Sequence, residues 1–306
     1  MSATATTPVA PPVITTSEPE TITPLWRRRL RIFAHNKLAL VSLGYLVFIT
    51  LFCFLWPHIH PTNQTNQAAT FNVTWNQPPS AKHWLGTDSN GFDELGRIAF
   101  GGEYSLTLGF LAGFITIVVG TVYGMVSGFF GGVTDTIMMR ILDAFLSIPY
   151  LFLLIALITI FQRTTTMLII VIGVTGWWGN ARIIRGDALL IRNLEYSQAA
   201  RSMGAGRMRI IWRHVFPNSI SNIVTVATFS IADAILFLSA LGFLGLGIVA
   251  PQTDWGTMLQ LGSQQLQNGY WWEIYPLAIV FILVIISINY IGDALRDVFE
   301  VRLLER

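Results

Sequence analysis

Long apolar stretches without any charged residue alternate with short charged segments along this 306-residue chain. A helix needs about 20 apolar residues to cross the hydrocarbon core of a membrane. The pattern therefore predicts an all-α integral membrane protein. The stretches that lack Asp, Glu, Lys and Arg are 104–134, 144–162, 164–181, 214–232, 234–253 and 274–292, and a further uncharged stretch, 38–81, is apolar in its first half.

We expect six transmembrane helices from these stretches. The region 215–253 is interrupted only by Asp233, and its length suits either one span with a re-entrant turn or two short spans. The charge distribution favours one span, which leaves Leu241–Gly247 as the end of that span or as a turn at the outer face. The spans are expected at roughly 38–56, 105–130, 137–161 (with Pro149 inside it), 164–181, within 215–253, and 273–292.

The basic residues predict the orientation of the chain. Cytoplasmic loops of membrane proteins carry an excess of Lys and Arg. With six spans and the N-terminus inside, sixteen of the 19 basic residues fall on cytoplasmic segments, and Lys82, Arg97 and Arg163 fall outside. A seventh span would carry the three arginines of the C-terminal segment outside and weaken this bias. We therefore expect both termini in the cytoplasm.

The same pattern divides the chain into segments. Residues 1–24 are rich in Thr, Pro and Ala and have no apolar signal region, so we interpret them as a disordered tail. The expected order is this cytoplasmic tail (1–24), a basic segment with the first span (25–56), an extracytoplasmic loop (57–103), a membrane domain (104–297) that contains a charged inner loop (182–218), and a cytoplasmic C-terminal tail (298–306).

Glycines are concentrated in the second span. Several are four residues apart, and small residues at that spacing let helix backbones approach closely in lipid. Glycine is also common in transmembrane helices in general, but we favour close packing of this span against other helices. The glycines are Gly109, Gly113, Gly120, Gly124 and Gly128.

Composition excludes several classes of function. Only 12% of the residues are charged, 53% are hydrophobic and the net charge is +2, which excludes a soluble domain and a nucleic-acid binder. The single cysteine, Cys53, excludes a disulfide scaffold. A phosphate-binding P-loop needs a Gly-Lys pair, and neither Lys37 nor Lys82 follows a glycine, so the chain is not the ATPase of a pump. The spacing predicts no catalytic group and no metal site, and we interpret the pair His58 and His60 as interfacial.

One charged residue lies deep in a span. Asp233 has long uncharged stretches on both sides, and ionisable residues inside spans are functional candidates because their burial in the membrane is costly. Asp233 is expected either to line a transport pathway or to pair with a partner subunit. Trp177 and Trp178 are further candidates for the pathway.

The inner loop between the fourth and fifth spans has a helical composition despite its charges. Residues 194–203 are helix formers, Gly204 and Gly206 break the pattern, and 207–215 resume it before Pro217. This predicts a short helix, a sharp turn and a second short helix at the cytoplasmic surface. The surface suits insertion into a groove on a soluble partner, although an amphipathic helix on the lipid interface has the same pattern. Its small residues are Ala199, Ala200, Gly204 and Ala205.

The inner loop resembles the EAA motif of ATP-binding-cassette (ABC) importer permeases. More specifically, the chain resembles the second permease subunit of dipeptide and oligopeptide importers, a group that includes nickel and glutathione transporters. It departs from that pattern at Gln198, where an acidic residue is usual, and at Leu238, where many members have Glu. The EAA motif stands here as Gln198-Ala199-Ala200, Gly204 and Phe216-Pro217, and the other matching segments are His83–Asp88, Glu94–Arg97, Gly131–Pro149, Asn180–Arg185, Ala199–Ala205, Arg213–Asn218, Leu241–Gly247, Asp254–Gly256 and Ile291–Asp297.

The resemblance implies a type I ABC importer permease fold in the inner membrane of a prokaryote, and a non-catalytic role. The implied partners are a homologous second permease subunit, two cytoplasmic ATPase subunits, an extracytoplasmic substrate-binding protein and membrane lipid, with no nucleic acid. It also implies that this chain binds no cofactor and that ATP and magnesium bind the ATPase subunits. The residues implied in coupling to the ATPases are Gln198, Ala199, Ala200, Gly204, Ala205, Arg207 and Pro217.

The implied function is import of short peptides by alternating access, with this chain forming half of the pathway. Nickel chelates and glutathione are the alternative substrates within the same class. A secondary transporter without ATPases is a different class, which predicts internal repeats and intramembrane ion sites, and we find no repeat and few intramembrane charges. A membrane-embedded enzyme would need a His/Asp/Glu or Ser/Lys cluster at one membrane depth, and the spacing gives none.

Overall fold

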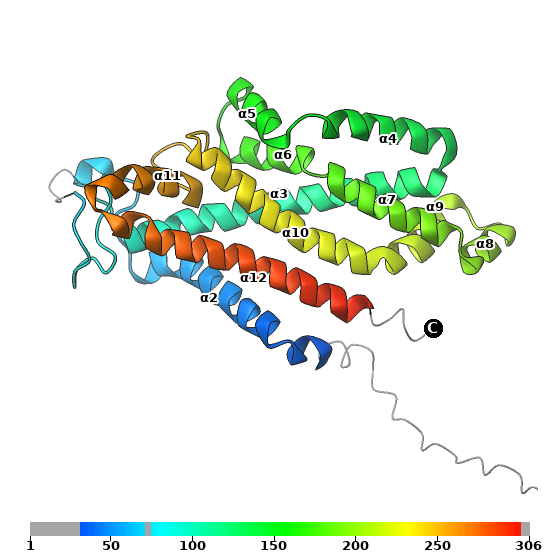
Figure 1. Cartoon of the computed structure of the whole chain (residues 1–306), viewed down its shortest axis with the longest axis horizontal. Coiled ribbons are helices and arrows are strands. Elements are labelled where there is room, and N and C mark those ends of the chain that lie inside the picture. The colour runs from blue at the N-terminus through cyan, green and yellow to red at the C-terminus, as the bar shows by residue number, and fades with distance from the viewer. Residues whose placement is uncertain (1–30, 71–74, 301–306) are drawn as a thin grey trace, which may run out of the picture.

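The computed structural model describes residues 31–70 and 75–300, and within them the chain is largely helical (Figure 1). The tail expected at 1–24, the first part of the basic segment and the last residues of the C-terminal tail lie outside the described residues. The helices labelled in Figure 1 are α2 (Lys37–Ile59), α3 (Glu94–Phe130), α4 (Gly132–Leu146), α5 (Tyr150–Ile160), α6 (Thr165–Thr175), α7 (Trp178–Arg192), α8 (Glu195–Ser202), α9 (Arg207–Ile210), α10 (Phe216–Phe243), α11 (Trp255–Gln265) and α12 (Tyr275–Glu300).

Five helical segments of the described chain are long and apolar enough to cross a membrane. A sixth candidate is the pair α4 and α5, whose axes meet at 81°. With this pair counted as one span, the prediction of an all-α membrane protein with six spans is confirmed. The five segments are Lys37–Ile59, Glu94–Phe130, Thr165–Arg192, Arg207–Phe243 and Trp271–Phe299.

The two described ends of the chain lie at the same end of the bundle as α8 (Figure 1). The short helix α11 and the loop between α2 and α3 lie at the opposite end. α8 and α9, which carry basic residues of the inner loop, thereby lie at one end, as in cytoplasmic segments of membrane proteins. We call the end with α8 the cytoplasmic end and the opposite one the outer end.

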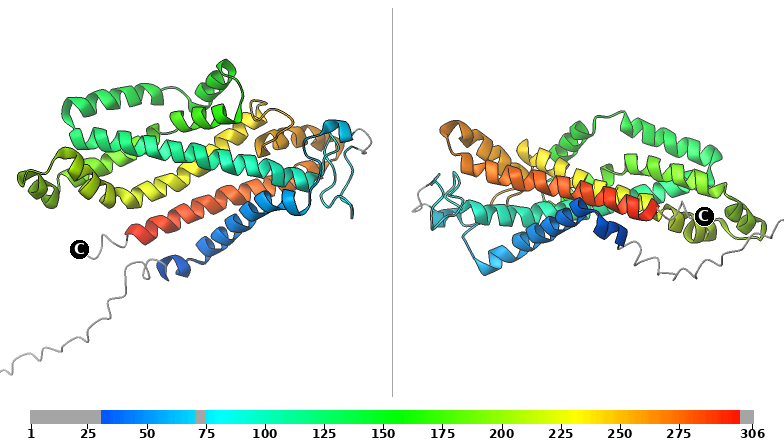
Figure 2. Two further views of the ribbon diagram at one scale, coloured as in Figure 1. Left: turned by 180° about the vertical axis from the view of Figure 1, so that it is seen from behind. Right: turned by 60° about the horizontal axis from the view of Figure 1, so that its bottom comes forward.

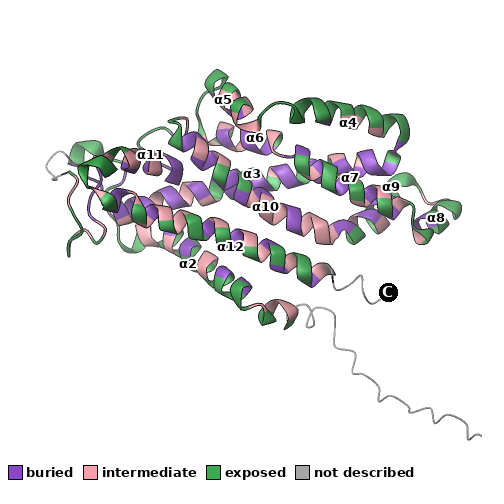
Figure 3. Cartoon of the chain, in the orientation of Figure 1, coloured by how far each residue is buried: buried purple, intermediate pink, exposed green. Residues whose placement is uncertain are grey.

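The third span is not the single helix that the sequence predicts over 137–161. α4 ends at Leu146, α5 begins at Tyr150, and Pro149 lies between them at the N-cap of α5. Proline disfavours helical geometry in the residue before it and has no N–H to donate, so the first helix ends there. Leu142 is the only buried residue of α4, and most of this helix is exposed (Figure 3).

Several helices extend beyond the spans expected from the apolar pattern. α3 begins at Glu94 because Asp93 caps it, its carboxylate accepting a backbone N–H of the first turn at 2.9 Å. The outer loop is therefore shorter than the expected 57–103. At the cytoplasmic end α7 continues to Arg192, so it includes the first part of the charged inner loop, and α12 continues to Glu300, within the expected tail.

α3 runs along most of the bundle, as the view from behind shows (Figure 2), and its glycines lie against α7 and α10. A Cβ atom on Gly124 or Gly128 would collide with the backbone of α7, and one on Gly113 would lie 2.8 Å from the Cα atom of Ile231 in α10. Such close approach requires residues without side chains. The predicted close packing of this span is confirmed.

Gly124→Ala is expected to destabilise the folded chain. The added Cβ atom would collide with the carbonyl oxygen of Ala181 and lie 3.0 Å from the backbone nitrogen of Arg185, so α3 and α7 would have to separate. Overpacking of this kind typically costs about 1–3 kcal/mol, which thermal unfolding in detergent can measure.

The matched control for this variant is Gly44→Ala in α2, where nothing lies within 4 Å of the Cβ position. Alanine is the better helix former, so the control should be unchanged or slightly more stable. An equal loss of stability in both variants would contradict the packing explanation.

The fifth span ends in a turn at the outer end. α10 ends at Phe243, and Gly245 follows with φ of +75°. The buried carboxylate of Asp254 organises the return of the chain, since it accepts the N–H groups of Ile248 and Thr257 at 3.0 Å each. Burial raises the pKa of Asp254, although these hydrogen bonds act to lower it. The glycine-rich segment is thus a turn and not the start of another span.

A second group of buried contacts holds the outer end together. Arg97 belongs to the outer loop in the sequence prediction, but it lies in the first turns of α3 and is buried. Its guanidinium donates to the carbonyls of Gln64 at 2.7 Å and Pro251 at 3.3 Å, and its Nε lies 3.9 Å from the Asp88 carboxylate. Burial raises the pKa of Asp88, while a hydrogen bond from the Phe92 N–H and the charge of Arg97 act to lower it. These contacts connect three outer segments.

Candidate functional site

α8 and the turn after it project beyond α3 and α10 at the cytoplasmic end (Figure 1). α8 spans Glu195–Ser202, and α9 begins at Arg207 after the turn, which is the arrangement that the sequence predicts. α9 continues through a π-helical turn, Ile211–Val215, into α10. Because this helix is continuous to Phe243, a force on the turn is carried directly into the fifth span.

α8 has an inward and an outward face. Ser197 and Ala200 are buried, and Ala200 belongs to a hydrophobic cluster with Phe129 at the end of α3. On the outward face, the apolar side chain of Met203 is 82% exposed. We call this outward face the α8 surface, and it consists of Gln198, Ala199, Arg201, Ser202, Met203 and Gly204.

The sequence assigns four small residues to one surface, but the structure places them on two different faces. Ala199 and Gly204 are exposed on the α8 surface, whereas Ala200 and Ala205 pack against the bundle. The N–H of Ala205 donates to the carbonyl of Ala200 at 3.0 Å and closes the turn. The two inward alanines therefore hold α8 close to the ends of the spans, and the outward residues remain open to a partner.

Gly204 is required by the backbone of the turn. Its φ is +82°, a left-handed conformation that costs a residue with a Cβ atom about 1–2 kcal/mol. No atom lies within 4 Å of its Cβ position in the described part of the chain. A side chain at this position would therefore project outward from the α8 surface without a clash inside the subunit.

The other residues assigned to coupling make contacts within the chain. Gln198 donates from Nε2 to the carbonyl of Asn193 at 3.0 Å, a bond that a carboxylate at this position could not donate. The Arg207 guanidinium lies 5.4 Å from the centre of the Phe130 ring. Pro217, expected before the fifth span, lies in the first turn of α10, directly after the π-helical turn that interrupts the regular hydrogen-bond ladder.

Two ion pairs connect α4 to α7. Arg185 donates from Nε and Nη2 to the two oxygens of Asp135 at 2.6 and 2.7 Å, and the Ser127 hydroxyl donates to the same carboxylate at 2.5 Å. Arg182 donates to Asp143 at 2.5 Å, but both of these side chains are about half exposed. The bidentate geometry makes the first pair the stronger one. Since α4 has little buried surface, these pairs hold it against α7.

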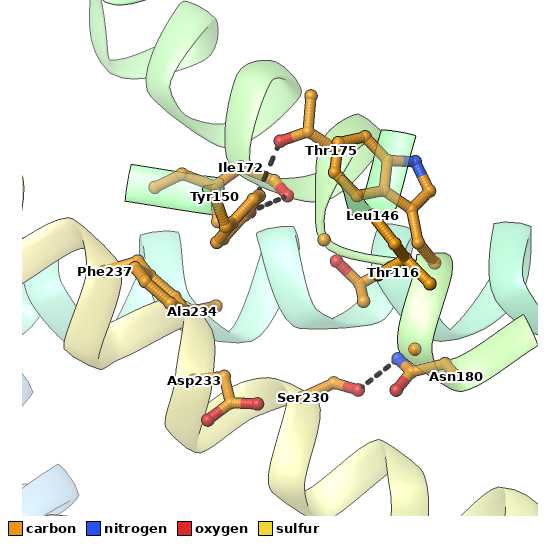
Figure 4. Close-up of a pocket in the computed structure, with 13 residues that line it drawn as sticks. Thr116, Leu146, Tyr150, Ile172, Thr175, Asn180, Ser230, Asp233, Ala234 and Phe237 are labelled. Carbon is orange, nitrogen blue, oxygen red and sulfur yellow. Dashed lines mark hydrogen bonds between the residues drawn. The ribbon is translucent and has the colours of Figure 1, made fainter. Parts of the chain in front are cut away.

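A pocket of about 140 Å³ lies between α10 and the helices α4 to α7 (Figure 4). Asp233 and Trp178 line it, so the structure brings together two of the three pathway candidates. Trp177 is not part of the lining. Its ring packs against Tyr123 at 4.6 Å between centroids, and its Nε1 donates to the carbonyl of Val174 at 2.7 Å.

The pocket also contains polar residues that the sequence analysis did not single out. Asn180 donates from Nδ2 to the hydroxyl of Ser230 at 2.7 Å. The Tyr150 hydroxyl donates to the carbonyl of Ile172 at 3.2 Å and accepts from the Thr175 hydroxyl at 3.3 Å. These residues come from different helices, so no periodicity predicts their meeting. In the sequence, each of these residues could be recognised only as a polar side chain within an apolar stretch.

The α8 surface and the pocket are suited to contact and binding. Within residues 31–70 and 75–300, no group of three or more His, Cys, Asp and Glu side chains is arranged to hold a metal ion. The helices that carry the α8 surface also carry the pocket, because α10 continues from α9 and α7 leads into α8. The arrangement can therefore transmit a movement from the cytoplasmic end to the middle of the bundle.

Two family models match this chain. The model for the binding-protein-dependent transport system inner membrane component matches residues 120–305, and the model for the N-terminal TM domain of oligopeptide transport permease C matches residues 24–79. The first match covers more than half of the chain and includes α7, α8 and α10. The chain belongs to the family of binding-protein-dependent transport system inner membrane components. It is a non-catalytic permease subunit of an ABC transporter, with multiple spans in the inner membrane.

Within this family the chain is of the OppC/DppC type. It is 38% identical to the oligopeptide transport system permease protein OppC of Haemophilus influenzae, over 90% of this chain and 88% of the relative. It is 37% identical to the dipeptide transport system permease protein DppC of Bacillus subtilis, over 91% and 85%. It is also 31% identical to the glutathione transport system permease protein GsiD of Pectobacterium atrosepticum, over 91% of both chains.

Solved structures of the methionine ABC transporter MetNI share the fold. Two inward-facing crystal forms match with TM-scores of 0.52 and 0.55 at 22% and 21% identity. The matches cover 65% and 66% of this chain and 94% and 96% of the matched chains. The expected ABC importer permease fold is confirmed.

Proposed function

We propose that this chain is one of two permease subunits in an importer of short peptides, and that it forms half of the translocation pathway. The observation that supports a peptide substrate is its identity of 38% and 37% to an oligopeptide and a dipeptide permease over about nine-tenths of its length. The pocket opens at the surface of this chain, which suits a pathway that a second subunit completes.

The proposed complex contains a homologous second permease, two cytoplasmic ATPase subunits and an extracytoplasmic binding protein. The α8 surface is the contact for an ATPase subunit, and the exposed side chain of Met203 enters a groove on it. ATP and magnesium bind the ATPase subunits in this scheme, because this chain contains no P-loop sequence.

Movement of α8 on ATP binding reaches the pocket by two routes. One route is the continuous helix 207–243, which carries part of the pocket wall. The other runs along α7 and across its two ion pairs to α4. The break of 81° between α4 and α5 lets α4 move as a rigid piece about residues 147–149. Rigid movements of this kind are the basis of alternating access.

Uptake by reconstituted proteoliposomes tests the proposed function. The full complex with its cognate binding protein is supplied in turn with a dipeptide, a tetrapeptide, glutathione and a nickel chelate. We expect uptake of the two peptides that requires ATP and the ATPase subunits. Uptake of peptides without the ATPases would favour a secondary transporter, and uptake of the nickel chelate alone would contradict a peptide substrate.

Glutathione is the second candidate substrate. The chain is 31% identical to a glutathione permease over 91% of both chains, which is somewhat below its identity to the peptide permeases. In the same uptake assay, transport of glutathione without transport of the dipeptide would favour this second candidate over the first.

A further inference from the structure

A seam of polar side chains between α7 and α10 leads from the cytoplasmic end to the pocket. Asn222 donates to both oxygens of Asp187 at 2.8 Å, and Asn180 donates to Ser230 at 2.7 Å. The members of these pairs lie seven or eight positions apart on their own helices. That spacing is about two helical turns, so they share one face of each helix. Asp233 follows Ser230 by three residues on this face of α10 and lines the pocket (Figure 4).

Asp233 differs from the paired residues of the seam. It is exposed to the pocket, and no hydrogen bond or ion pair joins it to another residue in the described part of the chain. The pocket lining contains no Lys, Arg or His. The carboxylate therefore lies at the pocket without a counter-charge from the described chain.

The depth of Asp233 makes an unpaired charge costly. α10 ends at Phe243, ten residues further on, which corresponds to about 15 Å of helix. The hydrocarbon core of a membrane is about 30 Å thick, so a residue this far inside the span lies within it. Ionisable groups at this depth face water or a partner of opposite charge.

Aromatic rings form another wall of the same pocket. Tyr150, Trp178 and Phe237 all line it. The ring of Tyr150 packs edge-on against Phe237 at 4.5 Å and against Trp178 at 6.0 Å between centroids. The face of an aromatic ring attracts a cation. The rings and the carboxylate therefore favour the same kind of ligand, a small organic cation.

We propose that this pocket is a subsite of the translocation pathway that binds the protonated α-amino group of the peptide, with Asp233 as its anionic partner. The inference rests on the proposed function and deepens it. An α-amino group has a pKa of about 7.7–8.0 and is mostly charged at neutral pH. Every free peptide carries this group whatever its side chains are, so one such subsite serves peptides of different sequence.

The test is the uptake of a dipeptide by the full complex, measured at increasing concentrations of loaded binding protein. Asp233→Asn removes the charge and keeps the shape of the side chain. The maximal rate should fall about tenfold or more, as for loss of a hydrogen bond to a charged group. The KM for the loaded binding protein should not change, because that protein acts at the outer end.

Two further variants test whether a negative charge at position 233 is what uptake requires. Asp233→Glu should restore at least part of the maximal rate, since the carboxylate is kept. Asp293→Asn is the matched control, because Asp293 is exposed near the cytoplasmic end of α12 and lines no part of the pocket. Its uptake should equal that of the wild type.

Two outcomes would overturn the inference. One is a maximal rate of Asp233→Asn within about twofold of the wild type. The other is loss of the second permease when the Asp233→Asn complex is purified, because the counter-charge would then be a residue of that subunit. The proposed function is judged separately on the wild-type complex. If the wild-type complex imports no dipeptide, the proposed function is wrong. If the wild-type and Asp233→Asn complexes import the dipeptide equally, only the proposed subsite is wrong.

Discussion

Gly204→Asp is expected to abolish ATP-dependent uptake while the subunit still folds into the membrane. The left-handed turn at φ of +82° costs a substituted residue about 1–2 kcal/mol, and a folded domain typically has about 5–15 kcal/mol of stability. The new carboxylate would project from the α8 surface, which we propose as the contact for an ATPase subunit. An unpaired charge buried in a contact between subunits is strongly unfavourable, so the ATPase subunits should dissociate or lose their coupling.

The matched control for this variant is Gly132→Asp. Gly132 also has a positive φ, +55°, and nothing lies within 4 Å of its Cβ position, but it belongs to α4 and not to the α8 surface. The backbone strain and the added charge are therefore similar. We expect this variant to retain its ATPase subunits and most of its uptake. Normal uptake and normal stimulation of ATP hydrolysis by the Gly204→Asp complex would show that the α8 surface does not carry coupling.

Reversal of one charge in the Arg185–Asp135 pair is expected to lower uptake about tenfold or more while the ATPase subunits stay bound. Arg185→Asp places two carboxylates where a bidentate pair holds α4 to α7. Few other contacts hold α4, chiefly its one buried residue, Leu142, and a hydrogen bond from the Tyr123 hydroxyl to the carbonyl of Met138 at 2.8 Å. The movement of α4 should then no longer follow that of α7. The measurement is ATP-dependent uptake compared with ATP hydrolysis by the same complex.

The double variant with Arg185→Asp and Asp135→Arg restores opposite charges and should recover part of the uptake. Recovery by the double variant would show that opposite charges at these two positions, and not the particular side chains, connect the helices. Arg182→Asp should have a smaller effect, because its pair with Asp143 is about half exposed. If the double variant transports no better than either single variant, this ion pair does not connect the two helices in transport.

The spans could be predicted because the membrane imposes a simple rule on sequence. A charge-free stretch such as 104–134 leaves one structural choice, a helix. The break at Pro149 could not be predicted in the same way. A span tolerates proline when neighbouring groups form hydrogen bonds with the backbone groups that the proline leaves without a partner. The early start of α3 had a local signal, the capping residue Asp93, but the apolar pattern begins only later in that helix.

The site could be predicted where its geometry is local. The turn at Gly204 follows from the glycines between two helical patterns. By contrast, Asp135 and Arg185 are 50 positions apart and meet only because α4 folds back beside α7. Trp177 and Trp178 are neighbours at the start of a helix, so they point in different directions, and only one reaches the pocket. Such choices depend on packing between helices, which spacing along the chain does not record.

A photo-crosslinking residue at position 203 tests the account most directly. Met203 is 82% exposed on the α8 surface, and Phe152 in α5, 69% exposed, serves as the control position. In membranes that contain the assembled complex, irradiation should join position 203 to an ATPase subunit and should join position 152 to none. Crosslinks from position 203 to lipid or to the second permease alone would contradict the account, because α8 would then lie on the membrane surface.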